Sequence, residues 1–456
     1  MNRAAFGGTP EDAARLSALG REAAVDLLLD EAERAAAVPL DADLSDLRAE
    51  ARLKARALEG PSAAAERRRL LDQARDADER RLGAFRGAWF DRMSRGPAPA
   101  LEKATLFWSQ HFTTSRLEVR DGAAVMRQHL LLRRLALGDF RALLHAIARD
   151  PAMLEYLDAD RNRRGRPNEN FAREVMELFV LGLGAYGEAD VREAARAFTG
   201  WSAEDGRFVF RPRLHDFGSK TVLGRTGAWN GDDVLDVLLE QDAAPRFLAR
   251  RLLAFYVAPE PSDAFTARIA DAFRRNGRRI RPTLRAIFLD PEFDAARGAR
   301  VSSPAEFAAS LARKLPGEPQ PGAFLARACD AMGHALFAPP NVKGWEGDDA
   351  WIDPSAILLR SRLALTMVEG ADADRSGAFR GGALGGATPR RTRAFDVASF
   401  LAARGAVDAE RAVDALCDHF LAVPVSAASR SALIAYASER LVDGDSLALR
   451  GPKAGG

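Results

Sequence analysis

The sequence contains little cysteine, little lysine and no long apolar run. Its 456 residues include two cysteines, Cys329 and Cys417, which are too few for a disulfide framework or a cysteine-ligated zinc site. No apolar stretch approaches the roughly 18 residues that a membrane-spanning helix needs, so we expect no membrane span. The 66 Lys and Arg residues nearly balance 64 Asp and Glu residues, for a net charge of +2. Because nucleic-acid-binding proteins usually show a clustered basic excess, nucleic acid is not expected as a partner, and only the Arg161–Arg166 cluster favours one.

Several common catalytic motifs are also missing. The sequence has no glycine-rich phosphate loop, no Gly-x-Ser-x-Gly nucleophile elbow and no His-Glu-x-x-His helix. No reaction is therefore indicated by a familiar motif alone. The chain is nevertheless 47% hydrophobic and long enough, at about 150 residues per domain, for roughly three folding units with a buried core.

Helix-start signals dominate the sequence. Thr9-Pro10, Asp150-Pro151, Asp290-Pro291 and Asp353-Pro354 each combine a capping side chain with a proline at the first helical position. Ser303-Pro304-Ala305-Glu306 adds a full capping box, in which Ser and Glu satisfy each other's backbone N–H groups. These signals predict a mainly α protein built as a large, bundle-like helical domain.

Two segments depart from the helical pattern. Near residues 203–224, glycines and a proline surround the alternating run Arg207–Phe210, which predicts a short β-hairpin or an ordered loop insertion. Residues 338–352 form a second irregular stretch, rich in Pro, Gly and Trp. Because loops carry many binding and catalytic residues, both segments are candidates for a site.

The composition also predicts how the chain is divided. We expect an N-terminal helical region over 1–95, a central helical core over 96–368 that carries the motifs, and a C-terminal helical segment over 395–456. Residues 369–394, rich in Gly, Arg and Ala, are expected to be a flexible linker. The start of the chain lacks the apolar segment of a signal peptide, which predicts a cytoplasmic protein as written, or a periplasmic or exported one if a leader precedes Met1.

Four segments carry a resemblance to a known family. They include Trp108-Ser109-Gln110-His111-Phe112, Asn168-Glu169-Asn170-Phe171-Ala172-Arg173-Glu174, His215-Asp216-Phe217-Gly218-Ser219-Lys220 and Pro339-Pro340-Asn341-Val342-Lys343-Gly344-Trp345. In this order they resemble the bacterial domain-of-unknown-function 1800 family. The resemblance implies a mostly helical protein that is often exported, with a sulfatase-like protein as a possible partner. Many members carry His-x-His where this chain has Ser109 and His111, so the metal site that such a pair suggests is weakened here.

The helix expected to begin near Pro167 carries the first candidate residues. Glu174 is a candidate catalytic base or ligand, with Arg173 and Glu177 as binding residues on the same polar face. The alternative is a solvated surface on which Glu169–Arg173 and Arg173–Glu177 are ordinary ion pairs four residues apart.

The remaining titratable candidates lie in the other segments. His215, Asp216 and Lys220 are candidate catalytic residues, because an imidazole beside a carboxylate can act as a base and a nearby ammonium can bind an anion. His111 and His215 are the candidate metal ligands. Equally, His111 suits a hydrogen-bonded core position, and 215–220 suits a turn in which Asp216 bonds the backbone and Gly218 has positive φ.

The Pro339–Trp345 segment supplies candidate binding residues. Asn341, Lys343 and Trp345 present an amide, a cation and an indole that suit a sugar face or an anionic group. The alternative is that Trp345 only anchors an irregular loop to the core.

Two hypotheses for function follow. The first is a hydrolase, metal-assisted or acid–base, that acts on an envelope polymer or conjugate; its cofactor is unknown, and a divalent metal is possible on this chemistry. The second is a helical scaffold that binds a sulfatase-like partner protein and catalyses no reaction.

Overall fold

The computed structural model describes residues 1–40, 42–60, 62–317, 320–369 and 395–442. Over these residues the predicted mainly α fold is confirmed, with 64% helix in 21 helices and two small β-hairpins. All but one residue of the predicted linker at 369–394 lies outside the described residues. No described helix is long and apolar enough to cross a membrane.

The predicted helix starts are confirmed because each depends on residues close together in sequence. The side chains of Thr9, Asp150, Asp290 and Ser303 accept hydrogen bonds from backbone N–H groups in the first turns of the helices that follow them. Asp353 does the same, with the N–H of Ala356 at 3.0 Å. These caps satisfy N–H groups that have no partner within the helix.

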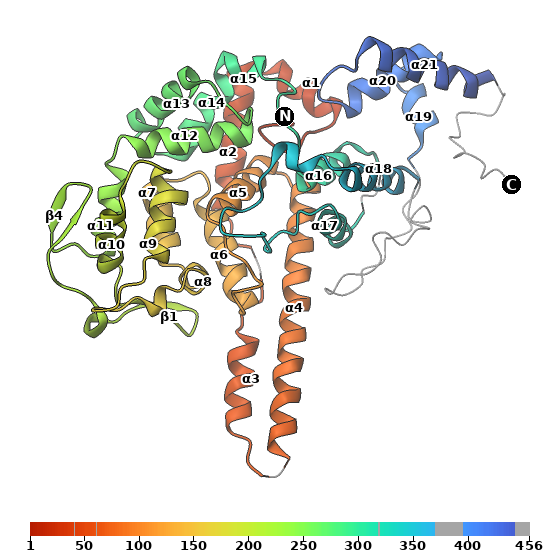
Figure 1. The fold of residues 1–456 in the computed structure, drawn as a ribbon. Helices are drawn as coiled ribbons and strands as arrows, with labels where there is room; N and C mark the ends of the chain where they lie inside the picture. Colours follow the sequence, from red (N-terminus) through yellow and green to blue (C-terminus); the bar gives the residue numbers. More distant parts are fainter. Residues whose placement is uncertain (41, 61, 318–319, 370–394, 443–456) are drawn as a thin grey trace.

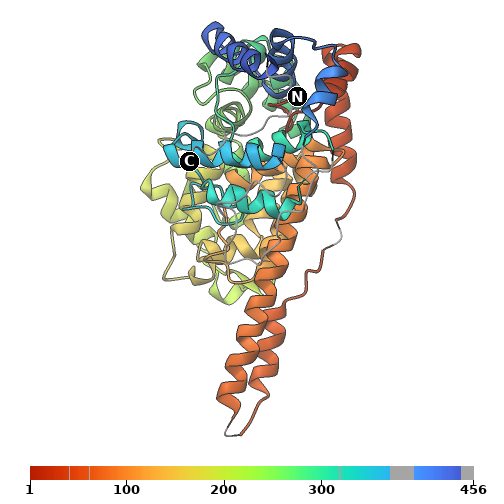
Figure 2. The same ribbon diagram turned by 90° about the vertical axis from the view of Figure 1, so that its right-hand side faces the viewer.

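A pair of antiparallel helices, α3 (Leu47–Arg56) and α4 (Ala63–Arg95), forms a hairpin whose tip projects far from the body in two perpendicular views (Figures 1 and 2). The buried side chains of α3 are Ala51 and Ala55, so the two helices approach closely but bury little apolar surface. Where the hairpin enters the body, Asp78 is buried and accepts a hydrogen bond from the N–H of Gly122 at 2.9 Å. The second half of α4 then continues into the main core.

The body is a packed set of helices around that core (Figure 1). Its first helices are α1 (Pro10–Ala18), α2 (Arg21–Ala36), α5 (Pro99–His111), α6 (Gly122–Leu135), α7 (Phe140–Ala148), α8 (Pro151–Tyr156), η1 (Ala159–Arg161), α9 (Asn170–Glu174), the π-helix η2 (Val175–Leu181) and α10 (Glu188–Ala197). The later ones are η3 (Pro212–Leu214), α11 (Gly231–Leu239), α12 (Ala243–Tyr256), α13 (Asp263–Arg275), α14 (Ile280–Leu289), α15 (Pro291–Ala295), α16 (Pro304–Lys314), α17 (Gly322–Ala331), η4 (Asp348–Trp351) and α18 (Pro354–Glu369). The last described helices are α19 (Val397–Ala402), α20 (Ala409–Phe420) and α21 (Ala427–Val442).

One continuous apolar core extends through the body from Ala4 to Met367. Its largest fully buried side chains include Trp89, on α4, and Trp108, on α5. A second, small cluster of Val397, Phe400, Leu401 and Ala412 joins α19 to α20. The main core contains residues from both sides of position 95, where we predicted the first domain boundary. The predicted domain boundaries remain predictions.

The non-helical segment near 203–224 holds two hairpins where the sequence predicted one at most. β1 (Trp201–Glu204) pairs with β2 (Arg207–Phe210), and β3 (Lys220–Val222) pairs with β4 (Arg225–Gly227). Asp205 and Gly206 both have positive φ, which suits a two-residue turn between twisted strands. The strands of the second hairpin are three residues long, too short for an alternating pattern to reveal them.

Candidate functional site

The helix that carries Arg173, Glu174 and Glu177 changes its hydrogen-bonding pattern part-way along. The α-helix α9 ends at Glu174 and continues directly as the π-helix η2. π-Helical turns are rare in proteins, and those that do occur are often found at functional sites. Phe171 and Val175 are buried on one side of this segment. Glu174 therefore stands at the junction between the two helical forms.

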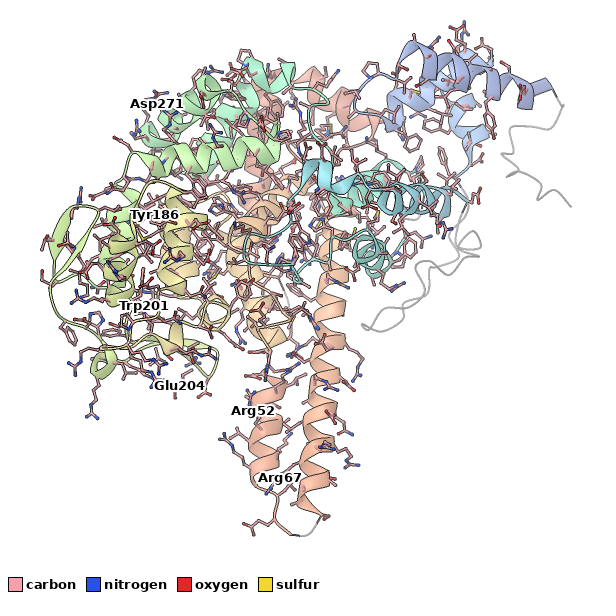
Figure 3. The ribbon with its side chains drawn as sticks, in the orientation of Figure 1. Arg52, Arg67, Tyr186, Trp201, Glu204 and Asp271 are labelled. Atoms are coloured by element: carbon pink, nitrogen blue, oxygen red, sulfur yellow. The ribbon has the colours of Figure 1, made fainter. Side chains whose placement is uncertain are left out.

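Arg173 forms ion pairs on the surface beside this junction. Its guanidinium bonds the carboxylate of Glu188 at 2.7 and 2.8 Å and that of Glu169 at 3.1 Å. The expected Arg173–Glu177 pair is absent, and both residues have other partners. Instead, the hydroxyl of Tyr186 donates to Oε2 of Glu177 at 2.8 Å; Figure 3 labels Tyr186.

Glu174 is half-buried, and its protonation is perturbed. Burial raises the pKa of Glu174, and the neighbouring carboxylate of Glu177 raises it further. The ammonium of Lys343 acts in the opposite direction but with a smaller effect. Lys343 therefore lies near Glu174 although 169 residues separate them in sequence (343 − 174). In the fold, Glu177 and Lys343 therefore both act electrostatically on Glu174.

His111 is a buried core residue at the end of α5. Its Nε2 lies 3.0 Å from the carbonyl oxygen of Phe179, so Nε2 carries the proton and donates it. Phe179 lies in the last turn of η2, where carbonyl groups have no partner within the helix, and His111 supplies one. Burial lowers the pKa of His111 to about 3, with Arg251 as a second cause. The imidazole is consequently neutral near pH 7.

The segment 215–220 forms a turn whose polar side chains bond the turn backbone and the neighbouring residues Thr199 and Arg196. Nδ1 of His215 donates to the carbonyl of Thr199 at 2.8 Å, and Nζ of Lys220 donates to the carbonyls of Asp216 and Gly218 at 2.6 and 3.0 Å. Arg196 binds the carboxylate of Asp216 at 2.8 Å and holds the pKa of Asp216 below its usual range. This is the structural arrangement considered above as the alternative.

One detail of that alternative is wrong. Gly218 does not have positive φ. A Cβ atom at position 218 would lie 3.0 Å from Nη2 of Arg196 and 3.0 Å from Oδ1 of Asp216. Glycine is therefore favoured here by the limited space beside the ion pair and not by backbone conformation.

The predicted site residues thus fall into two groups along α10. Arg173 binds Glu188 at the start of α10, whereas Asp216 binds Arg196 near its end. Eight residues of helix, at about 1.5 Å each, separate these contacts by roughly 12 Å. The ring contacts of His111 and His215 have no residue in common, and no group of three or more His, Cys, Asp or Glu side chains among the described residues is placed to hold a metal ion.

The Pro339–Trp345 loop packs against the end of α5, next to the first group. Oδ1 of Asn341 accepts a hydrogen bond from the N–H of Lys343 at 2.9 Å, which fixes the loop backbone. Gly344 has φ of 84° and packs against α5, where a Cβ atom would lie 3.3 Å from the carbonyl oxygen of Gln110. The ring of Trp345 contacts the buried imidazole of His334, with centroids 4.6 Å apart. Lys343, which is part of this loop, is exposed to solvent.

A cavity of about 280 Å³ opens beside this loop, against α5, α12 and the start of α16; we call it the loop cavity. Its aromatic lining comes from Phe107, Phe255, Trp345 and Trp351. Its charged lining consists of Arg251, Arg300, Lys343, Glu306, Glu346 and Asp348. Lys343 therefore belongs both to the surroundings of Glu174 and to this cavity.

A buried ion cluster forms one wall of the loop cavity. The carboxylate of Glu306, 3% exposed, binds Arg300 through both oxygens at 2.9 and 2.5 Å and also binds Lys103. The N–H of Ser303 completes this coordination at 2.8 Å. Burial alone would raise the pKa of Glu306, but Arg300 and Lys103 outweigh burial and hold the pKa below its usual range.

These features belong to a chain that matches one family over nearly its whole length. The model of the family described as "Protein of unknown function (DUF1800)" matches residues 1–447. The chain belongs to the DUF1800 family. No curated protein and no solved structure matches it. The resemblance inferred from the four segments is therefore confirmed.

Sequence reasoning missed three parts of this DUF1800 site. The π-helix has no sequence signature that distinguishes it from an α-helix over seven residues. Arg251 is one of many arginines, and nothing adjacent to it marks it. Lys103 offered a signal, because a lysine within the apolar stretch of α5 is unusual in a chain with so few lysines.

Proposed function

We propose that this DUF1800 protein is an acid–base hydrolase that acts on an envelope polymer or conjugate, with Glu174 as the proton donor. The observation that carries the proposal is the half-buried Glu174 at the start of a π-helix, with a pKa raised by burial and by Glu177. Two carboxylates in different environments are a common basis for acid–base hydrolysis, because one stays protonated while the other ionises.

The roles of the two carboxylates follow from their contacts. Protonated Glu174 donates its proton to the leaving-group oxygen as the scissile bond breaks. Glu177, oriented by the hydroxyl of Tyr186, accepts a proton from the water molecule whose oxygen adds to the substrate. Proton exchange with solvent then restores both groups.

This proposal keeps the acid–base form of the predicted reaction, because it is Glu174 and Glu177 that the structure sets beside each other. The catalytic roles predicted for His215, Asp216 and Lys220 stay predictions, as do the metal-binding roles of His111 and His215. The proposal does not use these residues, since their hydrogen-bonding groups hold the 215–220 turn and the end of η2.

The test compares Glu174→Gln with a matched substitution on the same surface. Glu188→Gln removes an exposed carboxylate whose one ion-pair partner within the described residues is Arg173, so it serves as the control. Hydrolysis would be followed on chromogenic glycosides and esters and on envelope polysaccharide fractions. We expect Glu174→Gln to lower kcat by about 10²-fold or more, the usual contribution of general acid catalysis, and Glu188→Gln to leave it unchanged. Wild-type kcat in Glu174→Gln, or equal losses in both variants, would overturn the proposal.

One observation favours the alternative, a scaffold for a sulfatase-like partner. The hairpin of α3 and α4 projects from the body, and Arg52 and Arg67 lie along it in Figure 3. Residues 52–69 contain six Lys or Arg and two Asp or Glu, a net charge of +4, whereas the whole chain has +2. A projecting basic tip suits attachment to an acidic surface of another protein.

A further inference from the structure

Arg251 is a cation without a counter-ion in the wall of the loop cavity. It is partly buried on α12, and its Nε is buried without a hydrogen-bond partner. Within the part of the chain that the structure describes, no carboxylate lies within ion-pair distance of Arg251. Burial lowers the pKa of Arg251, and no nearby carboxylate raises it again. A charge removed from water in this way is unfavourable unless a partner compensates it.

The carboxylates of the cavity do not supply that partner. Glu306 is bound by Arg300 and Lys103, and Oδ1 of Asp348 accepts a hydrogen bond from the N–H of Val301 at 2.6 Å. Glu346 is exposed. Lys343, on the loop, likewise forms no ion pair with the described residues. Two of the three cations in this cavity therefore remain available to an external anion.

The rest of the lining indicates what carries the anion. Phe107, Phe255, Trp345 and Trp351 give the cavity apolar ring surfaces, which suit the apolar faces of a sugar ring. A volume of about 280 Å³ lies just below the roughly 300–1,000 Å³ range of small-molecule sites, so a ligand as small as one sugar residue is the appropriate size. Arginine suits a planar or tetrahedral oxyanion, because its guanidinium donates two parallel hydrogen bonds.

We propose that the loop cavity binds one sugar residue that carries an oxyanion, a carboxylate or a phosphate, and that Arg251 and Lys343 hold that oxyanion. This site would define the substrate class of the proposed hydrolase. Its link to hydrolysis rests on the proposed function. Lys343 connects the two, since it lies in the cavity and near Glu174. Binding itself does not depend on Glu174.

Binding would be measured by calorimetric titration with glucuronate, glucose 6-phosphate, glucose and inorganic phosphate. Quenching of tryptophan fluorescence provides a second readout, because Trp345 and Trp351 line the cavity. We expect at least one of the two anionic sugars to bind at least tenfold more tightly than glucose and than inorganic phosphate. The anionic sugar that binds identifies the oxyanion. Equal binding of glucose, equal binding of inorganic phosphate, or no binding of either anionic sugar would each overturn the inference.

The variant Arg251→Met removes the charge and keeps most of the apolar stem. Its matched control is Arg250→Met on the same helix, since Arg250 is exposed and pairs with Asp263 at 2.8 Å. We expect Arg251→Met to bind the anionic sugar at least tenfold more weakly, and Arg250→Met to bind it as the wild type does. Arg251→Met should melt at the wild-type temperature or above, because an uncompensated charge is lost. Wild-type binding by Arg251→Met would overturn the inference.

The two proposals can fail separately. Glu174→Gln is expected to bind the anionic sugar with wild-type affinity, since Glu174 acts on the bond and not on the oxyanion. If the sugar binds and no substrate is hydrolysed, the loop cavity is a binding site and the hydrolase proposal is wrong. If hydrolysis depends on Glu174 but glucose binds as well as the anionic sugars, the hydrolase stands and the substrate class is wrong.

Discussion

Replacing Glu306 by Gln should destabilise the protein strongly, because this one carboxylate is the ion-pair partner of two buried cations. Lys103 is 0% exposed and Arg300 is largely buried, and both bind Glu306. The variant Glu306→Gln keeps the shape of the side chain but leaves both cations without a counter-ion. Breaking a buried ion pair in this way costs about 3–5 kcal/mol. Gln also loses the charged acceptor for the N–H of Ser303, which is part of the capping box of α16.

The size of the effect can be converted into a melting temperature. Unfolding entropy of about 2.1 cal/mol/K per residue gives, for the about 400 residues that the structure describes, roughly 0.8 kcal/mol/K. A loss of about 3–5 kcal/mol therefore lowers Tm by ~4–6 °C. Calorimetry and urea unfolding would both measure it. The control is Glu240→Gln, whose exposed pair with Arg225 should contribute only about 0–1 kcal/mol.

A second substitution tests the cause of the loss. In the double variant Lys103→Met with Glu306→Gln, one of the two uncompensated cations is removed. We expect the double variant to be more stable than Glu306→Gln alone, which is a non-additive result typical of contacting groups. The reasoning is refuted if Glu306→Gln costs no more than Glu240→Gln, or if the effects of the two substitutions simply add.

Two further predictions concern acid stability and the hairpin. Burial raises the pKa of Asp150 to about 6, above its unfolded value of 3.8, so between these values the folded state holds a proton that the unfolded state has released. The free energy of unfolding therefore falls by ~3 kcal/mol as pH rises from about 4 to about 6. The variant Asp150→Asn still caps α8 but has no carboxyl group to titrate, so its urea unfolding should not show that fall. An identical pH dependence of the wild type and the variant would contradict the prediction. The scaffold alternative is tested by replacing Arg52, Lys54 and Arg68 together by Glu. This variant should keep the wild-type Tm but should no longer co-purify with a co-expressed sulfatase-like protein. Unchanged co-purification would count against the hairpin as the docking element.

The parts of the fold that were predicted from sequence depend on residues close together in the chain. A cap such as Ser303 with Glu306 is complete within four residues, so its pattern identifies a helix start wherever it lies in the fold. The hairpin from Trp201 to Phe210 was found for the same reason, through a short alternating run and a turn containing Gly206. The π-helix was not predicted, because over seven residues its apolar pattern matches that of an α-helix.

The candidate site was predicted less well, because it depends on contacts between distant segments. Lys103 and Glu306 bind each other across 203 residues of sequence, and no local pattern links them. The group at 215–220 looked like a site because imidazole, carboxylate and ammonium are adjacent in sequence, but in the fold these groups bond the turn backbone and the end of α10 instead. Lys343 and Glu174 were candidates in two separate segments, and the electrostatic effect of Lys343 on Glu174 became visible only in the fold.

Arg251 and Arg300 show how stability and binding separate within a single cavity. Arg300 has Glu306 as a partner, so its charge is compensated without any ligand. Arg251 has no such partner, and an apolar side chain of similar length would pack in its place without the cost of burying a charge. A folded chain gains nothing from that charge by itself, so Arg251→Met should combine equal or greater stability with weaker binding, the trade-off expected of a binding residue. A variant that loses both stability and binding would instead show that Arg251 supports the fold, and the oxyanion site would have to be sought elsewhere.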